Sequence, residues 1–139
     1  MKSFSTSVHI RATPEAIWRT LMDTGRWPEL DSSIVRVDGT PALGATVTVH
    51  AKVGRAFALT VTELTPHERM VLSGGMPLGL FRGTRTYAVS RHADDTMAFS
   101  MREVYTGLLA PLITRSIPDL QPSFDRFAAN LKTHAERAA

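Results

Sequence analysis

Residues 13–31, TPEAIWRTLMDTGRWPELD, contain the signals that decide the fold. Thr13 is a suitable helix cap and Pro14 suits the first helical position, so a short helix is expected to begin here. Its apolar face consists of Ile17, Trp18, Leu21 and Met22. Gly25 is the expected stop, and RWPEL predicts a second helical turn. Helices this short are marginal alone, so the apolar face must pack on other parts of the chain.

The sequence on both sides of this segment alternates as β-strands do. FSTSVHIRA, residues 4–12, places Phe4, Val8 and Ile10 on one face and small polar or charged side chains on the other. SSIVRV, residues 32–37, returns to a strand pattern after the second helical turn. The short helices are therefore expected to connect two strands of one sheet.

Residues 45–106 continue with a period of two. The expected strands lie within TVTVHAKV, FALTVTEL, RMVLSG, FRGTRTYAVS and TMAFSMREVYT, separated by glycine and proline signals and by a turn at residues 93–95. Apolar side chains gather on one face, and threonine is frequent on the other. This pattern predicts an antiparallel meander with one buried side and one solvated side.

The last part of the chain changes to helical spacing. The expected apolar stripe consists of Leu120, Phe124, Phe127, Ala128 and Leu131. Two alternatives are open for its start. In one, Asp119 caps the helix and Pro122 lies in the first turn, where its missing N–H costs little. In the other, a longer helix begins near Pro111 and is kinked.

The predicted fold class is α+β. A curved antiparallel β-sheet of about six or seven strands is expected to wrap around a long C-terminal helix, because a strongly twisted sheet of that size curls. Two short helices follow the first strand and close one end. Residues 1–139 are expected to form a single domain, since a chain of this length builds one core.

Composition excludes several classes of protein. Hydrophobic residues make up 43% and charged residues 21% of the 139, as in globular domains, and cysteine is absent. Without cysteine there are no disulfides, thiolate metal sites or cysteine nucleophiles. The net charge of +3 is scattered and forms no basic block, so no nucleic-acid partner is expected. No stretch is apolar enough to predict a signal peptide or a membrane span, so a cytoplasmic location is expected.

The chain resembles the START-like (SRPBCC) superfamily, the helix-grip or polyketide cyclase/dehydrase-like proteins. The resemblance rests on SVHIRA followed by TPEAIWRTLMD and GRWPEL, and on the tail FDRFAANLKTHAE. It covers nearly the whole chain and implies the helix-grip fold. It also implies an apolar molecule held between the sheet and the terminal helix. Activity is not implied, because the superfamily contains lipid carriers, hormone-binding proteins and aromatic cyclases.

Motifs of catalysis and metal binding are missing from the sequence. GxSxG, a P-loop, GxGxxG and HExxH do not occur, and the five histidines lack metal-ligand spacing. No metal site and no cofactor are expected. His50 lies in the middle of an expected strand, but the alternation places it on the solvated face with Thr48 and Lys52.

The two long strands before and after residues 93–95 contain an anomaly. The register that matches apolar with apolar residues sets Val89 opposite Phe99 and, two positions further on, Tyr87 opposite Met101. The same register then directs Arg85 and Glu103 inward, opposite each other. A charge on the buried face needs a partner. Two interpretations are open: a structural ion pair, or the polar anchors of an otherwise apolar site.

The expected ligand site combines these charges with apolar residues of the sheet and the terminal helix. Its candidate residues are Phe57, Leu59, Met76, Phe81, Arg85, Tyr87, Phe99, Met101, Glu103, Tyr105, Phe124, Phe127 and Leu131. The glycine-rich loop over residues 74–83 is a candidate gate, with Met76, Leu78 and Leu80 as apolar contacts. The alternative for this loop is a plain turn.

The preferred functional hypothesis is binding of a small hydrophobic molecule: a lipid, a polyketide or an aromatic metabolite. One alternative is a cyclase or dehydratase acting on such a molecule, in which Arg85 stabilises an enolate-like oxygen and Glu103 or Tyr87 handles a proton. Another is a protein-interaction module with a filled core. The sequence does not specify the oligomeric state.

Overall fold

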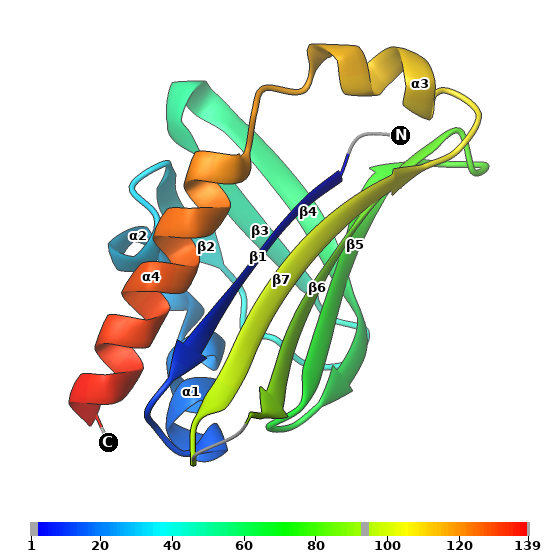
Figure 1. Ribbon diagram of the computed structural model, residues 1–139. Coiled ribbons are helices and arrows are strands. Elements are labelled where there is room, and N and C mark those ends of the chain that lie inside the picture. Colours follow the sequence, from blue (N-terminus) through cyan, green and yellow to red (C-terminus); the bar gives the residue numbers. More distant parts are fainter. Residues whose placement is uncertain (1–2, 93–94, 139) are drawn as a thin grey trace.

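The computed structural model describes residues 3–92 and 95–138 (Figure 1). All seven strands pair antiparallel in one sheet, in the order β1-β7-β6-β5-β4-β3-β2. The strands are β1 (Ser3–Ile10), β2 (Ile34–Asp38), β3 (Thr46–Ala51), β4 (Arg55–Thr65), β5 (Arg69–Met76), β6 (Phe81–Arg91) and β7 (Met97–Thr106). Two residues of the turn expected at 93–95, Ala93 and Asp94, lie outside the described residues.

Four α-helices complete the fold: α1 (Pro14–Met22), α2 (Trp27–Leu30), α3 (Ala110–Ile113) and α4 (Gln121–Ala138). The sheet curls into a half-barrel, and α4 packs against β1, β7, α1 and α2 (Figure 1). The helix-grip prediction, with two short helices after the first strand, is confirmed. Among the described helices, none has the length and apolarity needed to cross a membrane.

The segment 13–31 folds as its sequence indicates, with one difference. The Thr13 hydroxyl accepts a 3.1 Å hydrogen bond from the Ala16 N–H and caps α1. The helix ends at Met22, before the expected stop at Gly25, and a 3₁₀ turn leads into α2. The indole N–H of Trp27 donates a 2.9 Å hydrogen bond to the Leu21 carbonyl. That buried bond satisfies a carbonyl at the end of α1 and ties α2 to it.

The element boundaries correct one further prediction and add one helix. The strand expected over TVTVHAKV ends at Ala51, and a 3₁₀ turn (Lys52–Gly54) separates β3 from β4. The helix α3 was not expected as a separate element. The first alternative for α4 is confirmed, because Asp119 Oδ1 accepts a hydrogen bond from the Gln121 N–H and Pro122 lies in the first turn.

The two ends of the half-barrel differ. At the α1 end lie α1, the β2–β3 and β4–β5 connections and the C-terminal half of α4 (Figure 1). At the α3 end lie the β3–β4 connection, the β5–β6 turn, α3 and the first turn of α4. Antiparallel pairing fixes this division, since consecutive connections alternate between the ends of a meander. We use the terms α1 end and α3 end below.

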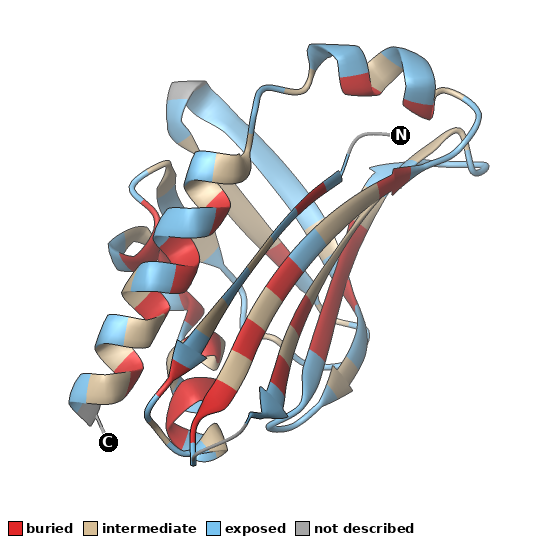
Figure 2. Ribbon diagram, in the orientation of Figure 1, coloured by how far each residue is buried: buried red, intermediate tan, exposed pale blue. Residues whose placement is uncertain are grey.

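The core fills the concave side of the sheet toward the α1 end (Figure 2). Its largest fully buried side chains are Trp27, Tyr87, Phe99, Phe124, Ile10, Ile17, Leu21, Leu30, Met70, Leu72, Met101 and Leu131. Trp27 stands against Phe127 with ring centroids 5.2 Å apart and planes at 89°. The short helices therefore close the α1 end, as the sequence predicts.

Candidate functional site

The inward-facing charges occupy the middle of the concave face. β6 and β7 pair in the expected register, with Arg85 opposite Glu103 and Tyr87 opposite Met101. Arg85 Nε and Nη2 donate to Glu103 Oε1 and Oε2, each at 3.1 Å. Both side chains are mostly buried, 25% exposed for Arg85 and 13% for Glu103. This bidentate geometry is the strong form of a charge-assisted hydrogen bond.

Tyr105 completes a polar cluster with this pair. Its hydroxyl donates to Glu103 Oε2 at 2.6 Å. Its ring stacks on Phe81 with centroids 5.8 Å apart. Room for the ring comes from Gly83, where a Cβ would lie 3.4 Å from Tyr105 Cε1. We call Arg85, Glu103 and Tyr105 the polar cluster.

The surroundings of the polar cluster shift the pKa values of Tyr105 and Arg85. Burial, and then the adjacent carboxylate of Glu103, raise the pKa of Tyr105, so the phenol is a neutral donor. Burial, the largest single effect, opposes the charge of Arg85, but Glu103 and Tyr87 together outweigh it and raise the pKa of the guanidinium. The Arg85 Cζ also lies 4.7 Å from the centroid of the Phe124 ring, a favourable cation–π position.

The candidate ligand residues divide into two groups by burial. Six of them lie in the packed core, as part of one apolar cluster: Tyr87, Phe99, Met101, Phe124, Phe127 and Leu131. The phenol of Tyr87 has a raised pKa, first because of burial. These residues form the floor beneath the polar cluster.

The second group lies toward the α3 end and is incompletely covered. Phe57 is paired with Val49 on the same face as the buried Val61, yet it is 48% exposed. Leu59 and Phe81 are half-buried, and Met76 is exposed. The concave face thus changes from a filled core to partly open apolar surface at the polar cluster. The structure brings both groups onto one face.

The glycine-rich loop is shorter than expected. Strand β5 continues to Met76 and β6 begins at Phe81, so the connection is the four-residue turn at 77–80. Gly75 is part of the paired strand at φ +153°, and a Cβ there would lie 2.3 Å from the Phe81 carbonyl oxygen. The ten-residue gate over 74–83 is therefore wrong as a loop, and replacing Gly75 would disrupt the strand pairing itself.

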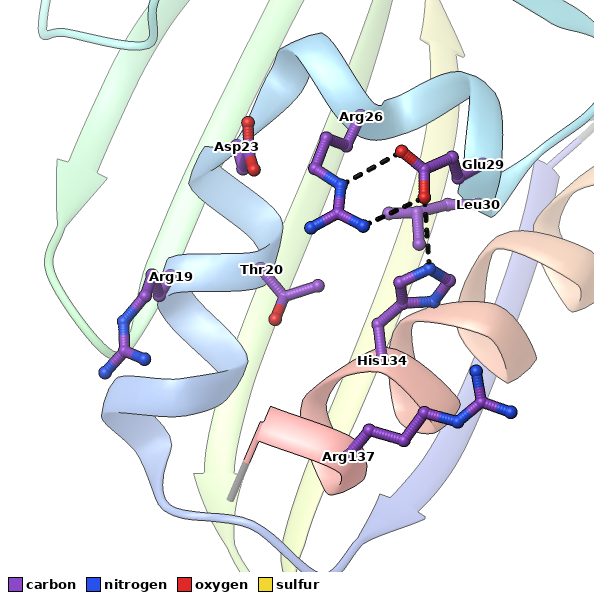
Figure 3. Close-up of a pocket in the computed structure, with 8 residues that line it drawn as sticks. All are labelled: Arg19, Thr20, Asp23, Arg26, Glu29, Leu30, His134 and Arg137. Carbon is purple, nitrogen blue, oxygen red and sulfur yellow. Dashed lines mark hydrogen bonds and ion pairs between the residues drawn. The ribbon is translucent and has the colours of Figure 1, made fainter.

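A separate pocket of about 480 Å³ lies on the outer side, between α1, α2 and α4 (Figure 3). Most of the residues that line it are polar or charged: Arg19, Thr20, Asp23, Arg26, Glu29, Leu30, His134 and Arg137. Arg26 donates twice to Glu29, at 2.9 and 3.0 Å, and His134 Nε2 lies 3.5 Å from the same carboxylate (Figure 3). These polar contacts join α2 to α4 at the surface.

Sequence reasoning did not identify the pocket between the helices. The spacing of Arg26 and Glu29, three residues apart on a helical turn, is visible in the sequence. The approach of His134 to Glu29 across 105 positions is not, since it depends on how α4 docks. The pocket shares no residue with the expected ligand site.

His50 lies on the outer face, as the alternation predicts. Its Nε2 lies 2.7 Å from Asp38 Oδ2, so the two side chains form a surface pair. Within the described ranges, no group of three or more histidines and carboxylates could hold a metal ion.

Comparison with solved structures places this geometry among known folds. The protein MLL2253 from Mesorhizobium loti matches with a TM-score of 0.77 at 18% identity, covering 99% of both chains. A START superfamily protein from Mycobacterium smegmatis matches with a TM-score of 0.69 at 10% identity, again covering 99% of each chain. The di-domain ARO/CYC BexL from the BE-7585A biosynthetic pathway matches at 0.70 and 16%, covering 98% of this chain and 47% of that one.

These identities are low enough that the structural likeness establishes the fold alone. A search of curated proteins found no match. The family model described as polyketide cyclase / dehydrase and lipid transport matches residues 1–136. Since that match covers nearly the whole chain, the protein belongs to the polyketide cyclase / dehydrase and lipid transport family and has a START-like (SRPBCC) fold.

Proposed function

We propose that the protein binds a small hydrophobic molecule on the concave face of the sheet at the α3 end. The observation that carries the proposal is the exposure of Phe57 on the face that elsewhere builds the core. An aromatic side chain there gains free energy when an apolar molecule covers it. Half-buried Leu59 and Phe81 extend the same surface inward to the polar cluster.

The polar cluster gives this surface a preference among guests. Small-molecule sites combine an apolar lining with a few fixed polar groups. The Arg85 guanidinium is held by Glu103 and Phe124, and the side chain remains 25% exposed. A lipid, polyketide or aromatic metabolite with one acceptor oxygen near its buried end fits this arrangement. The predicted lining residues are retained in this proposal, with the six core residues as its floor.

The family description and the neighbours support the proposal at the level of class. The description names lipid transport beside polyketide cyclisation, and both involve hydrophobic molecules. A nucleic-acid partner forms no part of the proposal, and a cytoplasmic location is proposed with it.

Titration with the neutral dye N-phenyl-1-naphthylamine tests the proposal. The dye should bind at a saturable site, and Phe57→Ser should weaken its binding about tenfold. Arg19→Ala, in the pocket between α1 and α4, is the matched control and should leave the dye affinity unchanged. Native mass spectrometry of the purified protein would identify a retained guest. Absence of saturable dye binding would refute the proposal.

A second candidate function is cyclase or dehydratase activity, and the polar cluster is the observation that favours it. Arg85 could stabilise an enolate-like oxygen of a bound substrate. Tyr105 is a neutral phenol that donates to Glu103, so it fits a hydrogen-bond donor better than a base. Turnover of an offered polyketide that disappears in Arg85→Met would establish this function, whereas unchanged turnover would exclude Arg85 from it.

A further inference from the structure

We propose that the α3 end docks on the surface of a bilayer that contains anionic phospholipid. Three leucines of this end are among the most exposed apolar side chains described: Leu78 at 93%, Leu108 at 84% and Leu112 at 69%. Scattered exposed leucines are ordinary, but a group at one end needs an explanation.

The three leucines belong to one surface, although they come from two separate parts of the chain. The Leu109 N–H donates to the Leu80 carbonyl at 2.8 Å, which joins the β7–α3 connection to the β5–β6 turn. The Leu112 N–H in turn donates to the Leu109 carbonyl at 3.0 Å. Figures 1 and 2 show the turn beside α3 at the rim of the half-barrel, with both largely exposed.

The backbone of Leu78 makes its position more informative. Its φ is +62°, in the left-handed region that bulky residues rarely adopt. Glycine is the residue that suits such a turn position in water. A leucine there has an unfavourable backbone conformation and a fully exposed side chain. The free energy gained when that side chain enters an apolar environment outside the protein would offset these two costs.

The exposed cations of the α3 end match an anionic surface. Arg82 in β6 and Arg115 after α3 lie on the elements next to the leucines, and Lys52 and Arg55 lie at the β3–β4 connection on the other side of this end (Figure 1). Among the described residues, none of the four forms an ion pair with a carboxylate. Asp119, two residues before α4, is an exposed carboxylate at the same end, and the four cations outweigh its charge. Leucines that insert at the headgroup boundary, with flanking Lys and Arg, are the usual composition of an interfacial anchor.

The surface is continuous with the proposed ligand site. Met76, the last residue of β5, is exposed and pairs with Phe81 at the top of the concave face. A guest leaving a bilayer at the α3 end would first meet Met76 and Phe81. This link between docking and ligand delivery rests on the proposed function, and it identifies a lipid bilayer as the source of the guest.

The shape of the surface favours a bilayer over an acidic protein. Leu78 protrudes at the tip of a turn and Leu112 lies on the outside of a four-residue helix. Protruding side chains insert into a fluid surface without a complementary partner, whereas protein interfaces require shape complementarity. An acidic partner is therefore the competing outcome of the test.

The experiment is co-sedimentation with vesicles of phosphatidylcholine, with and without phosphatidylglycerol. The protein should bind the anionic vesicles, bind the neutral ones more weakly, and lose the difference at high salt. Leu78→Ser and Leu108→Ser should each weaken partitioning about tenfold, because each removes inserted apolar surface. Leu43→Ser is the matched control, since Leu43 is 68% exposed but lies at the α1 end.

The outcomes separate this inference from the proposed function. Dye binding in solution is measured on the same variants, and it should persist in Leu78→Ser. Normal dye binding without vesicle binding would overturn the docking surface and leave the ligand site standing. Equal losses of vesicle binding in Leu78→Ser and Leu43→Ser would also overturn it. Binding to polyglutamate but not to vesicles, weakened by the same leucine substitutions, would point to an acidic protein partner and overturn it too. Circular dichroism confirms that each variant is folded.

Discussion

The Tyr105 hydroxyl and the Arg85 guanidinium bind the same oxygen of Glu103, at 2.6 and 3.1 Å. Glu103 is thus held by three donated hydrogen bonds on a face where it is only 13% exposed. The carboxylate of Glu103 therefore belongs to the fixed framework of the site. Arg85, which is 25% exposed, is the more accessible member of the ion pair for a guest.

The first prediction concerns this ion pair. Arg85→Met and Glu103→Leu should each lower the free energy of unfolding by about 3 kcal/mol, because each leaves a buried charge without its partner. The double variant should recover much of the loss, since an apolar pair needs no partner. Urea denaturation of the four proteins measures the coupling.

Ligand binding by the double variant then distinguishes the two roles of the pair. Polar anchors predict a folded double variant with reduced affinity for guests that carry an acceptor oxygen. A structural pair predicts unchanged affinity. Single variants as stable as the parent would contradict the burial of the pair.

The second prediction uses the fact that the chain has only two tyrosines. The pKa values of Tyr87 and Tyr105 are both raised, first by burial. A raised pKa means that the folded state favours the neutral phenol, so its contribution to stability is complete below about pH 10 and is lost as pH rises further. Near-ultraviolet titration should find no tyrosinate in the folded protein at about pH 10, where the denatured chain is half ionised. Half ionisation of the folded protein at that pH would contradict the burial of both rings.

The third prediction contrasts the floor of the site with its rim. Phe127 is buried, with its ring centroid 5.9 Å from that of Tyr87. Phe127→Ala should therefore cost about 3–5 kcal/mol of stability. Phe57→Ser should cost less than about 1 kcal/mol, because Phe57 is half exposed, and should mainly reduce ligand affinity. Thermal denaturation and dye titration of both variants check this. A larger loss of stability in Phe57→Ser than in Phe127→Ala would contradict the assignment of Phe127 to the packed core and Phe57 to the open surface.

The fourth prediction concerns Asp31, a buried carboxylate where α2 meets α4. It accepts hydrogen bonds from Ser33 N and Oγ, at 3.0 and 2.8 Å, from the Ser123 hydroxyl, and from Arg126 Nη2 at 3.1 Å. Burial raises the pKa of Asp31, but these hydrogen bonds together outweigh it and lower the pKa below its usual value. The ionised form is thus favoured by folding.

Its contribution to stability should be present above about pH 4 and lost as pH falls through the lowered pKa of the folded state. Asp31→Asn should cost about 1–3 kcal/mol at neutral pH. The difference from the parent should shrink toward pH 3, as measured by urea denaturation across this range. A difference that is independent of pH would show that the carboxylate is not ionised in the folded protein.

Much of the fold could be predicted because its signals are local. Alternation identifies the strands, and it fixed the β6–β7 register that directs Arg85 and Glu103 inward. The helix α3 was not predicted because four residues are too few to show a helical periodicity. For the same reason the sequence does not indicate that Leu108 and Leu112 are exposed. At the end of α1, the Trp27 indole donates to the Leu21 carbonyl, a contact that depends on how α2 packs and that local sequence signals do not show.

The candidate site was harder to predict because burial varies along one face. Phe57 and Phe127 look equivalent in the sequence, as aromatic residues on apolar faces. Their exposures differ because α4 covers the sheet at the α1 end and leaves it partly open at the α3 end. The Arg26–Glu29–His134 network likewise depends on the docking of α4.

Methyl NMR with added N-phenyl-1-naphthylamine tests the central claim, that a hydrophobic guest binds at the α3 end of the concave face, most directly. The account predicts saturable shifts of the Leu59 and Met76 methyl groups, with Leu43 and the outer-pocket residue Leu30 unaffected. Shifts confined to Leu30, or none at saturating dye, would contradict it.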